Sequence, residues 1–412
     1  MSGEILFLSH RIPFPPNRGD KIRSHHVLRH LAGLAPVHVA TFADDAADMA
    51  GEADLAALSA SHCLIERSKP MWRAGVEALA SGKPVSLTAF HSPRIAAYVR
   101  DLIASGRITT IYAFSGQMGQ YIPAGFDGRV VFDFVDVDSA KFEAYAETGT
   151  GPRRWIDARE GRLLAAEEAR LAASSNVSLL ISTEEAALFR ARLTPELRSV
   201  CDVRTLRNGI DSAQFAPGVC QAAAAMLACT GPHLVFAGQM DYAPNIAAAQ
   251  RAAERILPLV RAPFADASLH IVGRNPPAEL RALHGRGGVH VWGAVDDIRC
   301  SLAAADLALV PLTIARGVQN KVLEAMSMAL PVVLTAAAAT GIGGGDGVTY
   351  ALGESDQQLA AQTVALLHHR DRAGDLGQAA RRFVIDGLSW DATLAPLAGM
   401  LGMPGAAVRH AA

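Results

Sequence analysis

The sequence is poor in the features that mark several classes of protein. Its five cysteines are scattered over 412 residues without a Cys-x-x-Cys pair, which argues for free thiols in a reducing compartment and against a zinc site. It has no run of about 18 apolar residues that could span a bilayer. A net charge of -2 gives no indication of nucleic acid as a partner. The absence of G-x-x-x-x-G-K-[ST] excludes a P-loop protein, and no G-x-G-x-x-G follows the first strand of either half.

What the sequence does contain is the pattern of a large α/β protein. Half of its residues are hydrophobic, and short apolar runs typical of buried parallel strands alternate with helical segments. The length favours two domains of roughly 200 residues each. A turn-rich stretch after Arg-Asn-Gly-Ile-Asp marks the link between them. We predict domains at residues 1–206 and 207–388, and a C-terminal helix within 389–412 that packs back toward the first domain and ends in a frayed tail.

The most informative stretch is a strand–helix–strand unit between Asp306 and Leu334. The apolar run Leu307–Leu312 predicts a buried strand, and the spacing of Val318–Ala329 predicts a helix that ends before Pro331. Four polar residues cluster where this helix begins: Gln319, Asn320, Lys321 and Glu324.

This helix start has the chemistry of a phosphate site. A helix N-terminus offers unpaired N–H groups and a positive dipole end, and Lys321 adds a full charge. Glu324 lies three residues further on the same helix face, where a carboxylate can accept both hydroxyls of a ribose. The alternative interpretation is a solvated Lys–Glu pair in a first turn.

Other strand-end loops carry matching groups. In the second half they contain Gly238, Gly273 with Arg274, and Gly293, and in the first half Gly19, Ser115 and Asp136. The carboxyl ends of parallel strands gather at one edge of a sheet, where open α/β sheets bind ligands. Two such edges facing each other would form a cleft between the domains, a usual place for a ligand.

The loop and helix after the first strand form the most basic stretch of the chain, from Arg11 to Arg29. It either contributes to the ligand edge or forms a solvated basic helix face. We also hypothesise that it contacts anionic lipid.

Three carboxylates, Asp133, Asp136 and Asp138, stand at or after the end of the predicted strand Arg129–Phe134. Asp136-Val137-Asp138 is formally an Asp-x-Asp, which in some transferases holds a divalent metal. The alternative is that Asp138 or Ser139 caps the following helix, which leaves Asp136 as a base or hydroxyl-binding group. A charged segment further on, Arg153–Ala173, predicts a solvated helix.

Several of these segments together resemble a known family. Leu-Glu-Ala-Met-Ser-Met-Ala-Leu-Pro-Val-Val from Leu323 to Val333, with FAGQMDYAPN, IVGRNPP, HVWGAVDDI and ADLALVPL, resembles the C-terminal nucleotide-sugar domain of the GT-B glycosyltransferases, family 4. RIPFPPNRGDKIRSHHVLRHLA and VFDFVDVDSAKFEAYAE resemble, more narrowly, sugar transferases of the PEP-CTERM exopolysaccharide system.

The resemblance covers nearly the whole chain and implies a fold and a reaction. The fold would be the GT-B architecture, with two Rossmann-like domains facing across a cleft. The reaction would be a retaining transfer from a nucleotide-diphosphate sugar to a hydroxyl of a lipid-linked saccharide, without a cofactor or an obligatory metal. The protein would be cytoplasmic, with peripheral contact at the inner face of the membrane.

The resemblance also implies roles for residues of this chain. Glu324 would bind the ribose, Lys321 the diphosphate with help from Arg274, and Asp136 would face the acceptor. The remaining donor-binding residues would be Gln319 and Asn320 on the sugar, and Gly19 and Gly238 where backbone approaches the donor.

One departure from the family pattern keeps other functions open. Arg316 stands where the family usually has a glutamate eight residues before Glu324. A nucleotide-sugar 2-epimerase of the same fold and a non-catalytic sugar-nucleotide-binding protein are the alternatives.

Overall fold

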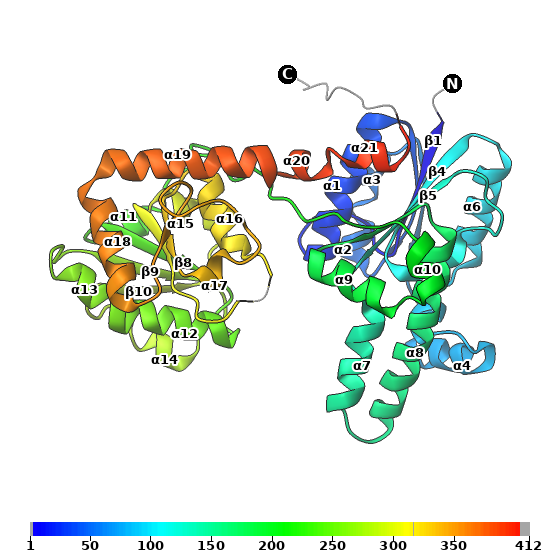
Figure 1. The fold of residues 1–412 in the computed structure, drawn as a ribbon, viewed down its shortest axis with the longest axis horizontal. Coiled ribbons are helices and arrows are strands. Elements are labelled where there is room, and N and C mark those ends of the chain that lie inside the picture. Colours follow the sequence, from blue (N-terminus) through cyan, green and yellow to red (C-terminus); the bar gives the residue numbers. More distant parts are fainter. Residues whose placement is uncertain (1–2, 316, 404–412) are drawn as a thin grey trace. The chain divides into compact units, whose positions relative to one another are not determined.

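The computed structural model describes residues 3–315 and 317–403, so the departure at Arg316 lies outside the described residues. The chain divides into two compact units (Figure 1). Unit 1 runs up to Asn208 and resumes at Thr393, and unit 2 is Gly209–Ala392. Each unit is built on a parallel sheet with helices packed against it, so the predicted α/β class with two Rossmann-like units is confirmed.

The sheet of unit 1 has seven strands in the order β3-β2-β1-β4-β5-β6-β7. All neighbours are parallel, and Ser9 at the end of β1 pairs with Thr41 on one side and Phe114 on the other. The strand order reverses between β1 and β4, which makes this pair the topological switch point of the unit. The strands are β1 Glu4–Ser9, β2 Val37–Ala43, β3 Ser61–Glu66, β4 Ile108–Phe114, β5 Arg129–Val135, β6 Val177–Leu180 and β7 Val203–Thr205.

The helices of unit 1 cover this sheet, and α7 and α8 pack side by side as a hairpin (Figure 1). The helix α8 is less solvated than its charge pattern predicts, because Glu160 is buried and accepts hydrogen bonds from the N–H groups of Val85 and Ser86, both at 2.8 Å. The helices are α1 Gly19–Leu34, α2 Ala46–Met49, α3 Glu52–Leu58, α4 Met71–Ser81, α5 Val85–Ala89, α6 Pro93–Ala104, η1 Gly116–Tyr121, α7 Asp138–Thr148, α8 Gly151–Ser174, α9 Thr183–Arg192, α10 Pro195–Val200 and α21 Leu397–Met400.

Unit 2 repeats the design with six strands in the order β10-β9-β8-β11-β12-β13, which reverses between β8 and β11. The strands are β8 His233–Ala237, β9 Ser268–Val272, β10 Val289–Gly293, β11 Leu307–Val310, β12 Val332–Leu334 and β13 Ala351–Leu352. The helices are α11 Ala224–Leu227, α12 Ala243–Arg251, η2 Ala252–Ile256, α13 Leu257–Arg261, α14 Ala278–Arg281, α15 Ile298–Ala303, α16 Asn320–Ser327, α17 Ala336–Ala339, α18 Asp356–His368 and α19 Arg370–Gly387, with α20 Trp390–Leu394 spanning the boundary of the units.

The two ends of unit 2 are joined to each other. Ile210 forms a parallel bridge with Ser389, its N–H donates to Leu388 O at 2.8 Å, and its carbonyl accepts from Trp390 N at 3.1 Å. Beyond this point the chain returns to unit 1, where Arg129 Nε donates to the Met400 carbonyl at 2.5 Å. Unit 2 is therefore one continuous segment, whereas unit 1 is assembled from two.

The helices also bear on the prediction that nothing spans a membrane. In the part of the chain that the structure describes, no helix combines the length and the apolar character needed to cross a bilayer.

A buried ion pair anchors α1 to the sheet of unit 1. Arg23 donates from Nε and Nη2 to the Asp133 carboxylate at 2.9 and 3.1 Å, and Tyr112 OH donates to the same carboxylate at 2.6 Å. The third nitrogen of Arg23, Nη1, donates to Asn208 Oδ1 at 2.9 Å, close to the boundary with unit 2. All three charged or phenolic side chains are fully buried. Arg23 is thus a structural residue and not part of a solvated basic face.

We predict that Arg23→Met lowers the free energy of unfolding of unit 1 by about 3–5 kcal/mol, because it leaves the Asp133 carboxylate buried without its cation. Tyr112→Phe removes one hydrogen bond to that carboxylate and should lower it by about 1.5–3 kcal/mol. Urea unfolding of the full chain, followed with two probes because the units can unfold separately, measures both.

The double variant Arg23→Met/Asp133→Leu is the control. It should be more stable than Arg23→Met alone, since no unpaired charge remains. A single variant as stable as the wild-type protein would contradict the structural role of Arg23.

Candidate functional site

The candidate site lies at the carboxyl edge of the sheet of unit 2, where β8 and β11 adjoin at the switch point. The loop after β11 leads into α16, which begins at Asn320, two residues later than predicted, and ends at Ser327. Its apolar face, including Val322 and Met326, is buried in the core of the unit. Packing of this face fixes the start of the helix beside the end of β8.

Polar groups of the first turn of α16 point to a site rather than to a solvated pair. The N-cap residue Gln319 directs its side-chain amide to Gly317 O at 3.1 Å rather than to the first N–H groups of the helix. Asn320 is exposed, whereas Lys321 and Glu324 are half-buried. Burial raises the pKa of Glu324, and the nearby ammonium of Lys321 only partly offsets that effect.

Lys321 is held by a neutral group. Its Nζ donates to Asn245 Oδ1 at 2.5 Å and lies 5.2 Å from the centre of the Phe236 ring. No ion pair found among the described residues includes Lys321. Burial lowers its pKa to about 8, although the carboxylate of Glu324 raises it in part. An ammonium in this setting gains stability from an added anion.

Glycine is favoured at the ends of β8 and β9 because neighbouring atoms lie too close for a side chain. A Cβ atom on Gly238 would lie 2.9 Å from Asn245 Nδ2 and 3.3 Å from Lys321 Nζ. A Cβ on Gly273 would lie 1.5 Å from the carbonyl oxygen of Gly238. These glycines let the two loops pack together beside the lysine. Asn245, which orients Lys321, was not among the predicted site residues, and no local sequence signal distinguishes it from an ordinary residue of a first helical turn.

Arg274 lies on the same edge. Its carbonyl accepts the N–H of Met240 at 2.9 Å, which joins the loop after β9 to the loop after β8, and its side chain is exposed. The structure therefore brings together Gly238, Arg274, Gln319, Asn320, Lys321 and Glu324 on one sheet edge of unit 2.

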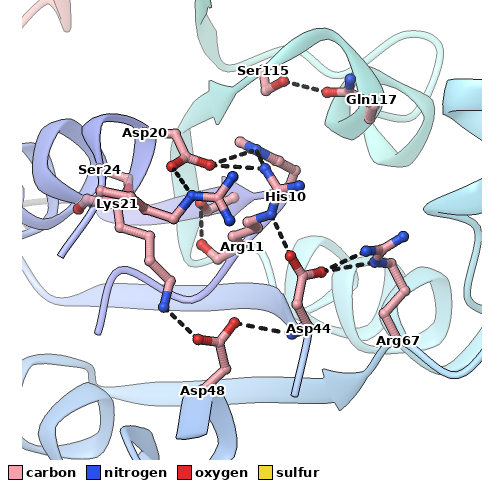
Figure 2. A network of polar contacts seen from close by, with 12 residues as sticks. His10, Arg11, Asp20, Lys21, Ser24, Asp44, Asp48, Arg67, Ser115 and Gln117 are labelled. Carbon is pink, nitrogen blue, oxygen red and sulfur yellow. Dashed lines mark hydrogen bonds and ion pairs between the residues drawn. The ribbon is translucent and has the colours of Figure 1, made fainter. Parts of the chain in front are cut away.

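The corresponding edge of unit 1 is rich in charge, but its cations are already paired (Figure 2). Arg11 donates to Asp44 at 2.6 Å and to Asp20 at 2.8 Å, and Arg18 lies 2.9 Å from Asp20. Lys21 is buried against Asp48 at 2.5 Å. The loop and the first turn of α1 are thus a neutralised network, whereas Arg29, further along the helix, is exposed and in no ion pair found among the described residues. Gly19 is exposed at the start of α1, and a Cβ atom added to it would meet nothing within 4 Å, so space alone does not require glycine there.

Asp136 follows β5 on a strained turn. Its N–H donates to Phe134 O at 2.9 Å across Val135, whose φ of 69° is unfavourable for a β-branched residue. Ser115, at the end of the neighbouring strand β4, also has a positive φ, and its N–H donates to Asp133 O at 2.8 Å. Asp136 is exposed, but partial desolvation of its carboxyl raises the pKa, whereas Lys141 and Arg23 lower it. Strain at two adjacent strand ends is consistent with a functional role for this edge.

The alternative prediction, that Asp138 or Ser139 caps the next helix, α7, is wrong. Asp138 is the first residue of α7 and does not cap it, and Ser139 does not cap it either. Instead, Glu185 accepts from Val137 N at 2.8 Å, and Glu168 accepts from Ser139 N at 2.9 Å. Both acceptors come from later helices, so the local sequence could not reveal them. Within the described ranges, no group of three or more His, Cys, Asp or Glu residues is arranged to hold a metal ion.

Comparisons with known structures define the class of fold. The Anabaena protein HepE, in complex with UDP and glucose, matches with 14% identity and a TM-score of 0.56, over 97% of this chain and 100% of that one. Sucrose-phosphate synthase from Thermosynechococcus elongatus matches with 17% identity and a TM-score of 0.56, over 97% and 98%. WaaG, a glycosyltransferase involved in lipopolysaccharide biosynthesis, matches with 19% identity and a TM-score of 0.52, over 98% and 100%. This chain has the GT-B fold.

The family comparison is more specific for unit 2. Residues 231–369 match the family model of the glycosyl transferases group 1, and this range contains all six predicted residues of the unit 2 edge. Unit 2 accordingly matches a glycosyl transferase group 1 domain, in agreement with the predicted class of enzyme. No curated protein matches it in sequence. Membership of family 4 and the link to the PEP-CTERM system stay predictions, as do the roles of the individual site residues.

The lowered pKa of Lys321 gives a measurable expectation. An amine reacts with acetic anhydride only when deprotonated, so the labelling rate of Lys321 should rise with a midpoint near pH 8. Competitive labelling from pH 6 to 11 with peptide mass spectrometry measures this rate, with the exposed Lys83 as the reference for the reagent. A midpoint for Lys321 above about pH 10, the value of an unperturbed lysine, would contradict the proposed burial.

Proposed function

We propose that the chain transfers a sugar from a nucleotide diphosphate to a hydroxyl group, with the donor held at the β8–β11 edge of unit 2. The observation that carries this proposal is Lys321: a half-buried ammonium, held by an amide oxygen at the start of α16 and next to a half-buried carboxylate. A diphosphate supplies the missing negative charge, and a ribose supplies hydroxyls to Glu324. Since HepE was solved with UDP-glucose, uridine diphosphate sugars are the first donors to test.

In the proposed reaction the edge stabilises the leaving group. As the bond between the sugar and the diphosphate breaks, negative charge grows on the diphosphate, and Lys321 and the first N–H groups of α16 stabilise it. Arg274, exposed on the same edge, adds a second positive charge. Gln319 and Asn320 contact the donor sugar. No metal has a part in this scheme, so transfer should continue in EDTA.

The acceptor side is proposed on the resemblance of the sequence. The acceptor would be a hydroxyl of a lipid-linked saccharide in exopolysaccharide synthesis, and the anomeric configuration of the sugar would be retained. Asp136, projected by the strained turn after β5, is the proposed acceptor-facing group. The role of Gly19 requires the two units to face each other, and it stays a prediction.

Lys321→Ala should lower kcat/KM for the donor by about 10²–10³-fold, the usual effect of removing one group that stabilises charge in the transition state. Glu324→Gln should weaken donor binding by about 10-fold or more, as expected for the loss of charge-assisted hydrogen bonds. The donor itself is first found by thermal-shift screening of nucleotide sugars, and radiolabelled transfer and calorimetry then measure the two effects. Arg100→Ala, at an exposed position on α6 of unit 1, is the matched control. Wild-type turnover in both Lys321→Ala and Glu324→Gln would contradict the proposal.

Asp136→Asn tests the acceptor side separately. It should reduce transfer at least 10-fold while the donor affinity stays within twofold, because Asp136 belongs to unit 1 and the donor groups belong to unit 2. Donor titration by calorimetry and transfer assays on the same preparation separate the effects. An equal loss of donor affinity would show that Asp136 does not act on the acceptor.

A further inference from the structure

Helix α4 is packed with its large apolar side chains outward. It buries Ala74 and Ala78 against unit 1, whereas four larger residues face solvent. Their exposed fractions are Met71 59%, Trp72 73%, Val76 60% and Leu79 61%. Trp72, Val76 and Leu79 are spaced by four and three residues, so they lie on one face of the helix. An apolar face of this kind on a folded unit marks an interaction surface.

The beginning of α8 extends this face. Arg159 Nη2 donates to Ala78 O at 2.9 Å and to Lys83 O at 3.2 Å, which holds the end of α4 against α8. Figure 1 shows α4 beside α8. One turn before Arg159, on the same side of α8, lies Trp155, which is 61% exposed, and Ile156 follows it, also exposed. Each of the two segments joined by Arg159 thus exposes a tryptophan.

Basic side chains surround this surface. Arg73, Lys83, Arg153 and Arg154 are all exposed. Two of them are paired with carboxylates of their own helices, Arg73 with Glu77 at 3.2 Å and Arg153 with Asp157 at 3.7 Å. No ion pair found among the described residues includes Lys83 or Arg154, so these two segments keep an excess of positive charge. The result is an apolar centre with tryptophan and a positive border.

We propose that α4 and the beginning of α8, with Met71, Trp72, Val76, Leu79, Trp155 and Ile156, form a docking surface for an anionic lipid bilayer. Apolar side chains enter the boundary between headgroups and acyl chains, and tryptophan is favoured at that depth. Arginine and lysine at the border attract anionic headgroups. This surface does not depend on the proposed sugar transfer.

Charge favours a bilayer over a second copy of the chain. In a two-fold dimer the same patch meets itself, so the arginines of one copy would face those of the other. An anionic membrane presents the opposite charge. The predicted lipid contact of the basic stretch Arg11–Arg29 stays a separate prediction; within it, Lys21 and Arg23 are buried, and Arg11 and Arg18 are paired with carboxylates.

Vesicle flotation of the full chain tests the proposal, with phosphatidylcholine vesicles that contain either no phosphatidylglycerol or about one third of it. The wild-type protein should float with the anionic vesicles and stay in solution with the neutral ones. Trp72→Ser/Val76→Ser should lose at least 10-fold in partition coefficient. Arg153→Glu/Arg154→Glu should lose about fivefold or more for each residue.

Matched controls use exposed residues on other helices of unit 1. Val200→Ser on α10 and Arg100→Glu on α6 should bind like the wild-type protein. Thermal unfolding of every variant verifies its fold, and Leu79→Ser replaces the double variant if that one is unstable. The proposal is overturned if the wild-type protein stays in solution with both vesicles, or if the α4 variants bind unchanged. It is also overturned if the α4 variants only convert a dimer to a monomer in size-exclusion chromatography.

Discussion

The chemistry of unit 2 depends on a lysine that is partly removed from water without a carboxylate in direct contact. The ammonium of Lys321 keeps one strong hydrogen bond, to Asn245, and the face of an aromatic ring. Desolvation without full compensation makes the charged form less stable, which is why the pKa falls. The glycines at the ends of β8 and β9 maintain this arrangement, because a side chain at Gly238 would crowd the amide and the ammonium, and one at Gly273 would clash with the carbonyl of Gly238.

The cations at the two sheet edges have different partners. In unit 1 each cation near the end of β1 has a carboxylate beside it, as Arg11 has Asp20 and Asp44 (Figure 2). In unit 2 the lysine faces an amide. A neutralised network is rigid and has little attraction for a phosphate, whereas an uncompensated cation next to a helix start attracts one. The same topology thus supports two different edges, and the difference lies in a few side chains.

The sequence predicted the parts that depend on local pattern. Periodicity located the strand–helix–strand unit around Lys321, with β12 at Val332–Leu334 and a shorter α16 than expected. The sequence did not predict contacts between distant segments, such as the buried ion pair of Arg23 and Asp133, which are 110 positions apart. For Arg11–Arg29 the sequence left open a ligand edge or a solvated helix face. The pairing of Arg11, Arg18 and Lys21 with carboxylates could not be predicted from composition.

The outward face of α4 escaped prediction for a related reason. An amphipathic pattern shows that a helix has an apolar side, but it does not show which side the unit covers. The small residues Ala74 and Ala78 fit against the neighbouring segments, and the tryptophan is left outside. Likewise, the capping of α7 by Glu168 and Glu185 could not be predicted from the local sequence, because these residues belong to two later helices.

The interrupted course of unit 1 has a consequence for synthesis. The ribosome completes Gly209–Ala392 before it makes the segment that contains Leu397 and Met400. At about 5–20 residues per second, this takes on the order of ten seconds or more. During that interval the nascent first sheet lacks the contact between Arg129 and the Met400 carbonyl and the buried side chain of Leu397. All residues of unit 2 are thus synthesised before those of unit 1 are complete, because unit 1 also includes the helix α21.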